Sequence, residues 1–185
     1  MVGVVPFRMT GVTLRPLPDL PWLSAFPELN VRLYVERDGK PGVWFLSLDA
    51  ANPVAVWAAR RFFHLPYFLA GMSLVEHAGA IRYRSRREGA EFQATYRPTS
   101  DVYRSAPGSL EHWLTERYCL YAVKPDGSLW RNDVHHAPWP LQSVDVAIRS
   151  NGMLGVHGLN VDGPPPLTHF ARRVDVVVWD AERVA

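Results

Sequence analysis

The chain has 185 residues, of which 48% are hydrophobic, and a formal net charge of +2. This length suits one domain with one core, so we expect a single domain over residues 1–185. The positive charge comes from 18 arginines and only two lysines, Lys40 and Lys124. Because the arginines are interspersed with acidic residues and form no long basic run, the charge pattern argues against nucleic-acid binding.

The cysteine content and the hydropathy of the sequence indicate where in the cell the protein is located. Cys119 is the only cysteine, so no internal disulfide can form, and the apolar run around it predicts a buried structural thiol. No apolar stretch approaches the ~20 residues that span a bilayer. Residues 1–8 do not have the pattern of a signal peptide. We therefore expect a cytoplasmic protein that does not associate with membranes.

Two neighbouring segments predict a pair of strands. Residues 28–36 alternate strictly between polar and apolar side chains, which is typical of a strand. A turn at 37–42 leads into residues 43–48, which are apolar on both faces and so are expected to be covered on both sides. If the two strands pair, the polar face of the first looks into an enclosure rather than into bulk water.

Helix signals occur at two places. Residues 49–52 followed by Pro53 mark a helix start, and apolar side chains then recur at helical spacing until Pro66 ends the pattern. That apolar set is Val54, Trp57, Ala58 and Phe62. Ser109 caps a second, shorter helix. Four tryptophans are interpreted as core residues, namely Trp44, Trp57, Trp113 and Trp139.

The remaining elements are mostly strands. Their predicted ranges are 72–78, 80–86, 91–97, 118–124, 127–134, 141–148 and 172–179. The hairpin at 80–97 carries Arg82, Arg84 and Arg86 on one face, which indicates its solvent side. Residues 158–168, with three consecutive prolines, predict a loop. The fold class expected is α+β: a β-rich antiparallel sheet that curls into a barrel or cone, with a few flanking helices.

Signatures of cofactor and metal chemistry are missing from the sequence. It contains no glycine-rich phosphate loop, no paired Cys-x-x-Cys, no His-Glu-x-x-His and no nucleophile elbow. His135 and His136 are adjacent, and neighbouring residues of a strand point to opposite faces, so they cannot both bind one metal without distortion. We predict no metal and no cofactor, with one imidazole facing inward and the other facing water.

Three side chains on one face of the first strand suggest a binding site. Glu28, Asn30 and Arg32 supply an acceptor, an amide and a fixed cation, a set that suits a carboxylate or a polarised carbonyl. The alternative is an exposed strand face with a solvated ion pair. Glu116 and Arg117, near the end of the second helix, are expected to be exposed or tied to a strand end.

Several blocks of the sequence resemble one family. They fall in order across about residues 4–180, at 26–32, 39–43, 47–50, 65–67, 114–118 and 134–141. These blocks are similar to the YqjF-like family of unknown function, which is placed in the acetoacetate-decarboxylase-like fold. The resemblance implies an antiparallel β-cone with a central cavity.

The chain departs from the decarboxylase pattern at the residue that carries the chemistry. In the decarboxylase, a Pro-Lys-Lys-Leu-Ala segment provides the Schiff-base lysine, whereas the similar segment here reads Pro66-Tyr67-Phe68-Leu69-Ala70. A tyrosine cannot form an imine with a keto acid. Both lysines of this chain lie in glycine-containing turns, where desolvation is not expected. The resemblance therefore implies the fold without the covalent chemistry.

A second departure concerns the front of the chain. YqjF-like proteins carry a tryptophan-containing segment before the block that resembles residues 4–9, and this chain begins almost at that block. We expect a sheet edge that lacks its neighbour. Because unpaired strand edges are templates for association, this edge is expected to pair with another copy of the chain.

These observations favour a small-molecule-binding domain whose ligand is an organic acid. Glu28, Asn30 and Arg32 would line the cavity, with Arg32 as the anion anchor, Tyr67 at the position of the relative's lysine, and His135 or His136 completing the set. Arg60 and Arg61 are weaker candidates. Two alternatives stay open: an enzyme that acts on a keto or hydroxy acid without a covalent intermediate, and an interaction module with a filled core.

Overall fold

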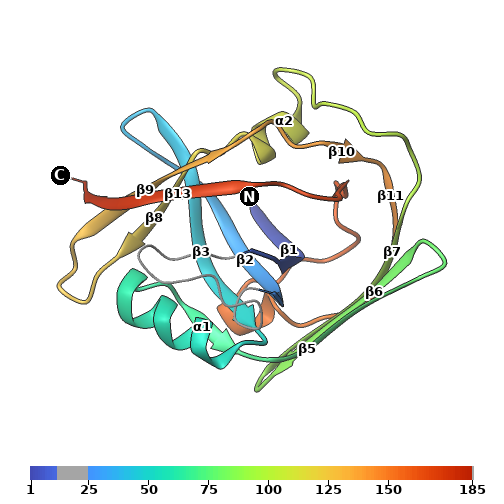
Figure 1. Ribbon diagram of the computed structural model, residues 1–185, viewed down its shortest axis with the longest axis horizontal. Helices are drawn as coiled ribbons and strands as arrows, with labels where there is room; N and C mark the ends of the chain where they lie inside the picture. Colours follow the sequence, from blue (N-terminus) through green and yellow to red (C-terminus); the bar gives the residue numbers. More distant parts are fainter. Residues whose placement is uncertain (12–24, 185) are drawn as a thin grey trace.

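A computed structural model describes residues 1–11 and 25–184. Its strands form three sheets (Figure 1). The largest has seven strands, in the order β1 (Val2–Met9), β2 (Phe26–Arg37), β3 (Lys40–Ala50), β8 (Cys119–Val123), β9 (Leu129–His136) and β13 (Val176–Arg183), with β4 (Tyr67–Leu69) paired to β3. The second has four, in the order β11 (Val144–Asn151), β7 (Ala90–Pro98), β6 (Ala80–Arg87) and β5 (Gly71–His77). The third pairs β10 (Leu141–Gln142) with β12 (Phe170–Ala171).

The predicted α+β class is confirmed, with one correction to its shape. Two short helices, α1 (Pro53–Ala58) and α2 (Leu110–Thr115), flank the sheets, and most strand pairs are antiparallel. Within residues 1–11 and 25–184 the strands do not close into a barrel, because each sheet ends on strands paired on one side only. None of the helices in this part of the chain is long and apolar enough to span a bilayer.

The β2–β3 hairpin forms as the sequence predicts. Asp38 and Gly39 both have positive φ angles, of 52° and 73°, which is the backbone of a tight two-residue hairpin turn. The strands pair in antiparallel register from Arg37 with Lys40 to Glu28 with Ala50. The register shifts between Val31 and Arg32, so the hairpin contains a β-bulge beside Arg32.

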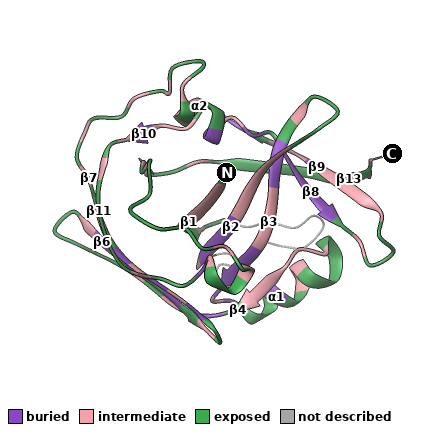
Figure 2. Cartoon of the chain, turned by 180° about the vertical axis from the view of Figure 1, so that it is seen from behind, coloured by how far each residue is buried: buried purple, intermediate pink, exposed green. Residues whose placement is uncertain are grey.

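The main core lies between the two larger sheets. Leu29 and Val31 of β2 are fully buried against Tyr83, Phe92 and Met153. Figure 2 shows buried segments on β2 and β3 and on the facing sheet. The opposite face of β2 is buried at Glu28, which is 3% exposed, and at Asn30, which is 5% exposed, but it is half-buried at Arg32 and Tyr34 and exposed at Glu36. The expectation that both faces are sheltered is therefore confirmed for the first half of the strand.

A buried ion pair joins the two sheets and was not predicted. Asp49 of β3 is fully buried. Its carboxylate accepts hydrogen bonds from Arg87 Nε at 2.8 Å and from Ser85 Oγ at 3.2 Å. The Arg87 guanidinium lies over the ring of Phe68, with its carbon 4.3 Å from the ring centre. Burial raises the pKa of Asp49, and Arg87 opposes that rise. Removing one partner would leave the other charge buried without compensation.

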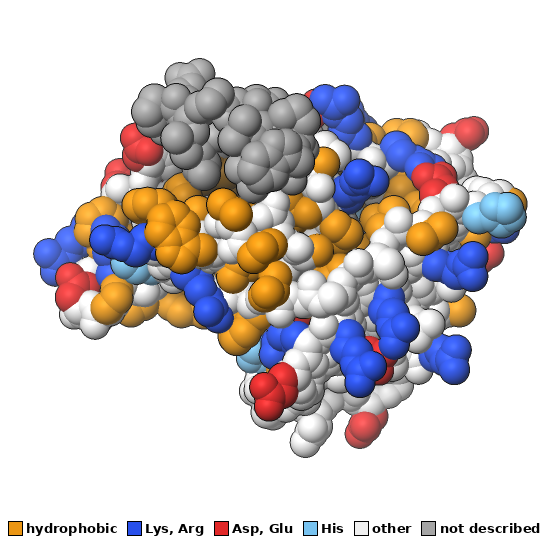
Figure 3. Space-filling view, turned by 60° about the horizontal axis from the view of Figure 1, so that its bottom comes forward, with side chains coloured by type: hydrophobic (Ala, Val, Ile, Leu, Met, Phe, Trp, Pro, Cys, Tyr) orange, Lys and Arg blue, Asp and Glu red, His pale blue; other side chains and the backbone are white. Residues whose placement is uncertain are grey.

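The first helix begins where predicted, but its apolar face points the other way. Asn52 caps it by accepting from the amides of Val54 and Ala55. Only Val56 of α1 is buried, whereas Trp57 is 61% exposed and Phe62 is 60% exposed. The π-helical turn Ala59–Phe63 follows α1 directly, and its wider period breaks the spacing on which the prediction rested. Figure 3 shows hydrophobic and basic side chains together on this side of the molecule.

Other predicted elements need smaller corrections. The core interpretation is also wrong for Trp113, which is 43% exposed, while Trp44 and Trp139 are half-buried. Arg82, Arg84 and Arg86 are exposed, so the solvent face of the β6–β7 hairpin is confirmed. The last strand, β13, lies about four residues beyond its predicted range of 172–179.

Gly42, at the junction of β3 with β8, gives a test of this packing. A Cβ there would lie 2.6 Å from Cys119 Sγ and 2.7 Å from the Cys119 carbonyl oxygen. The backbones must separate to admit it, so Gly42→Ala should lower the free energy of unfolding by about 1–3 kcal/mol in urea denaturation. Gly71→Ala is the matched control, because its nearest atom is 3.8 Å away. Equal stability of the two variants would contradict the close β3–β8 contact.

Candidate functional site

The candidate site follows the polar face of β2. Glu28, Asn30 and Arg32 alternate with the core residues, so they share the face opposite the main core. Four residues of strand separate Glu28 from Arg32, which corresponds to about 13 Å. The predicted set therefore has two ends, an acidic one and a cationic one, with Asn30 between them.

At the acidic end, Glu28 forms a buried pair with Tyr67. Strand β4 pairs in parallel with β3, and Tyr67 lies opposite Leu48. From there its hydroxyl donates to Glu28 Oε2 at 3.0 Å. Burial raises the pKa of Glu28 from its usual 4.5 to about 8, although the hydrogen bond from Tyr67 opposes the rise. Glu28 is thus largely protonated and uncharged at neutral pH.

At the cationic end, Arg32 has aromatic partners instead of acidic ones. Its Nε donates to the Tyr34 hydroxyl at 3.2 Å. Its guanidinium carbon lies 5.2 Å from the centre of the Tyr34 ring and 5.9 Å from that of Trp139. Among the described residues, no carboxylate forms an ion pair with Arg32. The alternative from the sequence, an exposed strand face with a solvated ion pair between Glu28 and Arg32, is therefore not what the described residues show.

Asn30 lies between the two ends and has an unused acceptor. Its side chain is 95% buried, since only 5% is exposed. Its Oδ1 accepts no hydrogen bond from the described part of the chain. Because buried polar atoms are nearly always satisfied, an acceptor left open here marks a place for a water molecule or a ligand group.

The two predicted histidines separate as expected. His136 is 6% exposed, stacks on Tyr118 with ring centres 4.7 Å apart, and meets Trp139 edge to face at 6.1 Å. It therefore adjoins the Trp139 ring that Arg32 contacts. His135 is exposed on the other face of β9.

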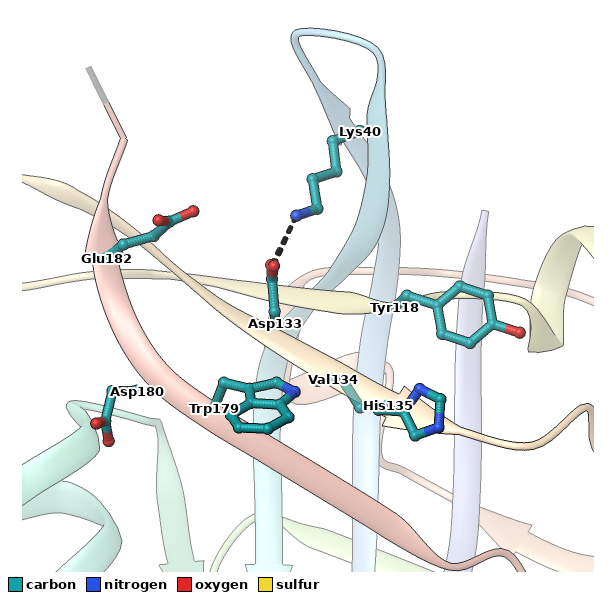
Figure 4. A pocket seen from close by; sticks show the side chains of 8 residues that line it. All are labelled: Lys40, Tyr118, Asp133, Val134, His135, Trp179, Asp180 and Glu182. Carbon is teal, nitrogen blue, oxygen red and sulfur yellow. Dashed lines mark hydrogen bonds and ion pairs between the residues drawn. The ribbon is translucent and has the colours of Figure 1, made fainter.

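His135 lines a different feature, an open surface hollow of about 530 Å³. Figure 4 shows its wall: Lys40 donates to Asp133 across the hollow at 2.7 Å, and Trp179 of β13 lies beside His135. This hollow contains neither Glu28 nor Arg32. Of the two histidines, His136 contacts Trp139, a ring that Arg32 also contacts, whereas His135 lines the hollow.

The remaining candidates can be placed as well. Arg60 and Arg61 are exposed and line a shallow surface hollow over α1 together with Trp57 and Leu69, so they lie outside the enclosed face. Arg60 nevertheless donates to the backbone oxygen of Tyr67. Within the described residues, no three His, Cys, Asp or Glu side chains are grouped to hold a metal ion.

Arg117 is a residue whose position the sequence reasoning missed. It was expected at the surface or tied to a strand end, but it is only 8% exposed. Its Nε donates to the Trp113 carbonyl oxygen at 2.7 Å, and its guanidinium carbon lies 3.9 Å from the Trp113 ring centre. A signal was available, since an arginine four residues after a tryptophan at a helix end can stack on it.

This arrangement of sheets is found in solved structures of acetoacetate decarboxylases and related enzymes. The decarboxylase of Legionella pneumophila superposes with a TM-score of 0.58 at 14% identity, over 88% of this chain and 68% of that one. The enduracididine biosynthesis enzyme MppR, in its complex with pyruvate, superposes with a TM-score of 0.56 at 14% identity, over 88% and 68%. At this identity the likeness shows the fold alone.

Sequence comparison shows the family. The chain belongs to the family DUF2071, described as an uncharacterized conserved protein, which matches residues 1–175. It is 44% identical to the uncharacterized protein YqjF of Bacillus subtilis (strain 168) over 181 residues, which cover 96% of this chain and 74% of YqjF. The resemblance inferred from the sequence blocks is confirmed.

The raised pKa of Glu28 predicts how stability depends on pH. A carboxyl whose pKa is higher in the folded than in the unfolded state costs no stability below pH 4.5, and the cost then grows until about pH 8. Glu28→Gln has no charge to bury and still accepts from Tyr67. The free energy of unfolding of the variant relative to the original chain should therefore rise by at least about 2 kcal/mol between these pH values.

Urea denaturation at several pH values measures this difference. Glu88→Gln serves as control, because Glu88 is exposed in a turn. A Glu28→Gln difference that stays constant with pH, like that of the control, would show that Glu28 is ionised normally in the folded protein.

Proposed function

We propose that this chain is a domain that binds a small organic acid without forming a covalent bond to it. The observation that carries the proposal is Arg32, a guanidinium on a sheltered strand face that has no acidic partner among the described residues. A half-buried cation of this kind is stabilised by an anion, and arginine can meet a carboxylate with two parallel hydrogen bonds.

The rest of the polar face supports an acid rather than a simple anion. Asn30 offers a free acceptor, and Glu28 and Tyr67 follow at the far end. Because Glu28 is largely protonated at neutral pH, it adds hydrogen-bonding capacity without repelling a carboxylate. The complex of MppR with pyruvate, a keto acid, supports the same class of ligand on this fold.

The position of Tyr67 supports non-covalent binding. Tyr67 stands in the segment similar to the decarboxylase's lysine segment, and a phenol cannot form an imine. Lys40 is engaged with Asp133, and Lys124 lies over the ring of Trp130. Neither lysine lines the polar face of β2. A cytoplasmic location stays a prediction from the sequence.

A second candidate function is acid–base catalysis on a keto or hydroxy acid, and the Glu28–Tyr67 pair favours it. A carboxyl with a pKa of about 8 exchanges its proton readily near neutral pH, and a tyrosine hydroxyl can donate to a developing oxyanion. Glu28→Gln separates the candidates: lost turnover with preserved binding indicates catalysis, while absence of turnover of any bound acid indicates binding alone.

We also propose that the chain associates with a second copy through β13, at the opposite end of the seven-stranded sheet from β1, rather than through the edge that the sequence predicts at the start of the chain. This strand ends the seven-stranded sheet, and Val176, Val177, Val178 and Trp179 on it are each about half exposed or more. An apolar edge strand offers unpaired backbone groups to an identical edge, and antiparallel pairing of two such edges gives a closed dimer.

The binding proposal predicts a ligand-dependent stabilisation. We expect at least one acid from a panel of keto, hydroxy and dicarboxylic acids to raise the melting temperature by several degrees, since ligand at about 100 times its Kd adds ~2.7 kcal/mol. Arg32→Ala should abolish the shift. The exposed Arg149→Ala, which removes the same charge elsewhere, should retain it. If no acid shifts the melting temperature of the original chain, the site does not bind this class and a filled core is favoured.

The association proposal predicts that the molecular mass in solution is that of a dimer. Light scattering should give a dimer for the original chain and a monomer for Val178→Lys, because a charge on the edge strand opposes pairing. Val102→Lys, at an exposed position outside the sheet edge, should leave the dimer intact. A monomeric original chain contradicts the proposal.

A further inference from the structure

A second arginine lies buried near the proposed anion anchor. Arg117 precedes β8 and is more than nine-tenths buried. Its Nε is used by the Trp113 carbonyl oxygen, but its Nη2 has no hydrogen-bond acceptor in the described part of the chain. No carboxylate of that part forms an ion pair with it. The guanidinium stacks on Trp113, yet its Nη2 lacks the hydrogen-bond acceptor that buried polar atoms normally have.

Arg117 and Arg32 meet at one aromatic ring. Their guanidinium carbons lie 5.9 Å and 5.2 Å, respectively, from the centre of the Tyr34 ring. Burial is the main cause that lowers the pKa of Arg117, Tyr34 and Glu36 oppose it, and the charge of Arg32 makes a smaller contribution in the same direction as burial. Two like charges near one ring are mutually unfavourable, and an anion that reaches both would relieve the repulsion.

Of the seven buried side-chain polar atoms without a hydrogen-bond partner in the described part of the chain, four belong to Arg117 and to residues close to Arg32. Besides Arg117 Nη2, they are Asn30 Oδ1, Trp139 Nε1 and His169 Nδ1, all buried and without partners among the described residues. Each belongs to a residue close to Arg32: Asn30 precedes it on the same strand face, and Trp139 lies under its guanidinium. His169 feels its charge, since the pKa of His169 is lowered by burial and then by Arg32.

A cluster of this kind points to a missing partner of defined chemistry. Native proteins leave few buried polar atoms unpaired, and several at one place indicate water or a ligand. Arg117 Nη2 and Trp139 Nε1 can only donate, and His169 Nδ1 donates in one tautomer. The cluster therefore presents two cations and further donors, which match acceptor oxygens and two negative charges on a ligand, while Asn30 Oδ1, which accepts, suits a hydroxyl group or a water molecule.

We propose that the site binds a dianion of the short dicarboxylate class, with Arg32 holding one carboxylate and Arg117 the other. This inference rests on the proposed organic-acid function and assigns its substrate class. The two guanidinium groups come from different elements, β2 and the segment before β8, and lie 5.2 Å and 5.9 Å from the centre of the Tyr34 ring, so we assign one carboxylate to each. Phosphate is the compact alternative that the test includes.

The test compares acids that differ only in their second charge. Calorimetric titration of the full chain with succinate and butyrate, and with 2-oxoglutarate and 2-oxovalerate, measures the preference directly. We expect the diacid of at least one pair to bind tenfold or more tightly, about the effect of one charge-assisted hydrogen bond. In Arg117→Gln the diacid should weaken to the affinity of its monoacid, while the monoacid changes little. Arg117→Lys should keep part of the preference, and Arg149→Gln should keep all of it.

The outcomes distinguish a failure of the dicarboxylate assignment from a failure of the organic-acid function on which it rests. If monoacids bind the original chain as tightly as diacids, or if inorganic phosphate binds more tightly than either, the dicarboxylate assignment is wrong and organic-acid or anion binding stands. If no acid of either charge binds, both the dicarboxylate assignment and the organic-acid function are wrong. If Arg117→Gln does not fold, the comparison on the original chain and on Arg117→Lys still decides.

Discussion

The exclusion of water from the polar face of β2 is the constraint on which the candidate site depends. A strand with a core on one side normally exposes the other, yet Glu28 and Asn30 are as inaccessible as many core residues. Burial of this kind is unfavourable for a carboxylate, an amide and a guanidinium unless each finds a partner or loses its charge. Glu28 accepts a hydrogen bond from Tyr67, and its raised pKa keeps it largely protonated at neutral pH. Asn30 Oδ1 has no partner among the described residues, and Arg32 has a hydroxyl and two aromatic rings but no carboxylate.

The asymmetry between the two ends of this face follows from the elements around it. Strand β4 returns beside β3 after α1 and brings Tyr67 to Glu28, so the acidic end is satisfied within the protein. At the other end, cations and hydrogen-bond donors come from Arg32, which lies beside the β-bulge, and from the segments that carry Arg117, Trp139 and His169. Among the described residues, Glu28 is paired at one end, whereas Asn30 Oδ1 and Arg117 Nη2 at the other have no hydrogen-bond partner. That difference is the basis on which a binding site is proposed at the cationic end.

The sequence was sufficient for the parts of the fold that depend on local pattern. Strict alternation predicted β2, the apolar run predicted β3, and Asn52 with Pro53 predicted the start of α1. It failed where orientation depends on distant contacts. In α1, Val56 and Ala55 pack on the cluster of Phe26 and Ala50 while Val54 and Trp57 face outward, and nothing in the helix spacing specifies that choice.

In the candidate site, too, local pattern predicts some residues and distant contacts determine the others. Glu28, Asn30 and Arg32 were found because they share one strand face, which period alone determines. Arg117 and His169 come to that face from segments more than 80 residues away in sequence, so no local pattern could associate them with it. The Asp49–Arg87 pair was missed for the same reason, since it bridges two sheets whose packing is set by the whole core.

Protonation of Glu28 measures the enclosure of β2 most directly. Carbon-13 NMR of the glutamate side-chain carboxyls, with Glu28 assigned by its absence in the glutamine variant, follows that single group through a pH titration. The enclosed face predicts a midpoint of about 8. A midpoint near the usual 4.5 would mean that water reaches Glu28, and the polar face of β2 would then be an ordinary strand surface with no need of a ligand.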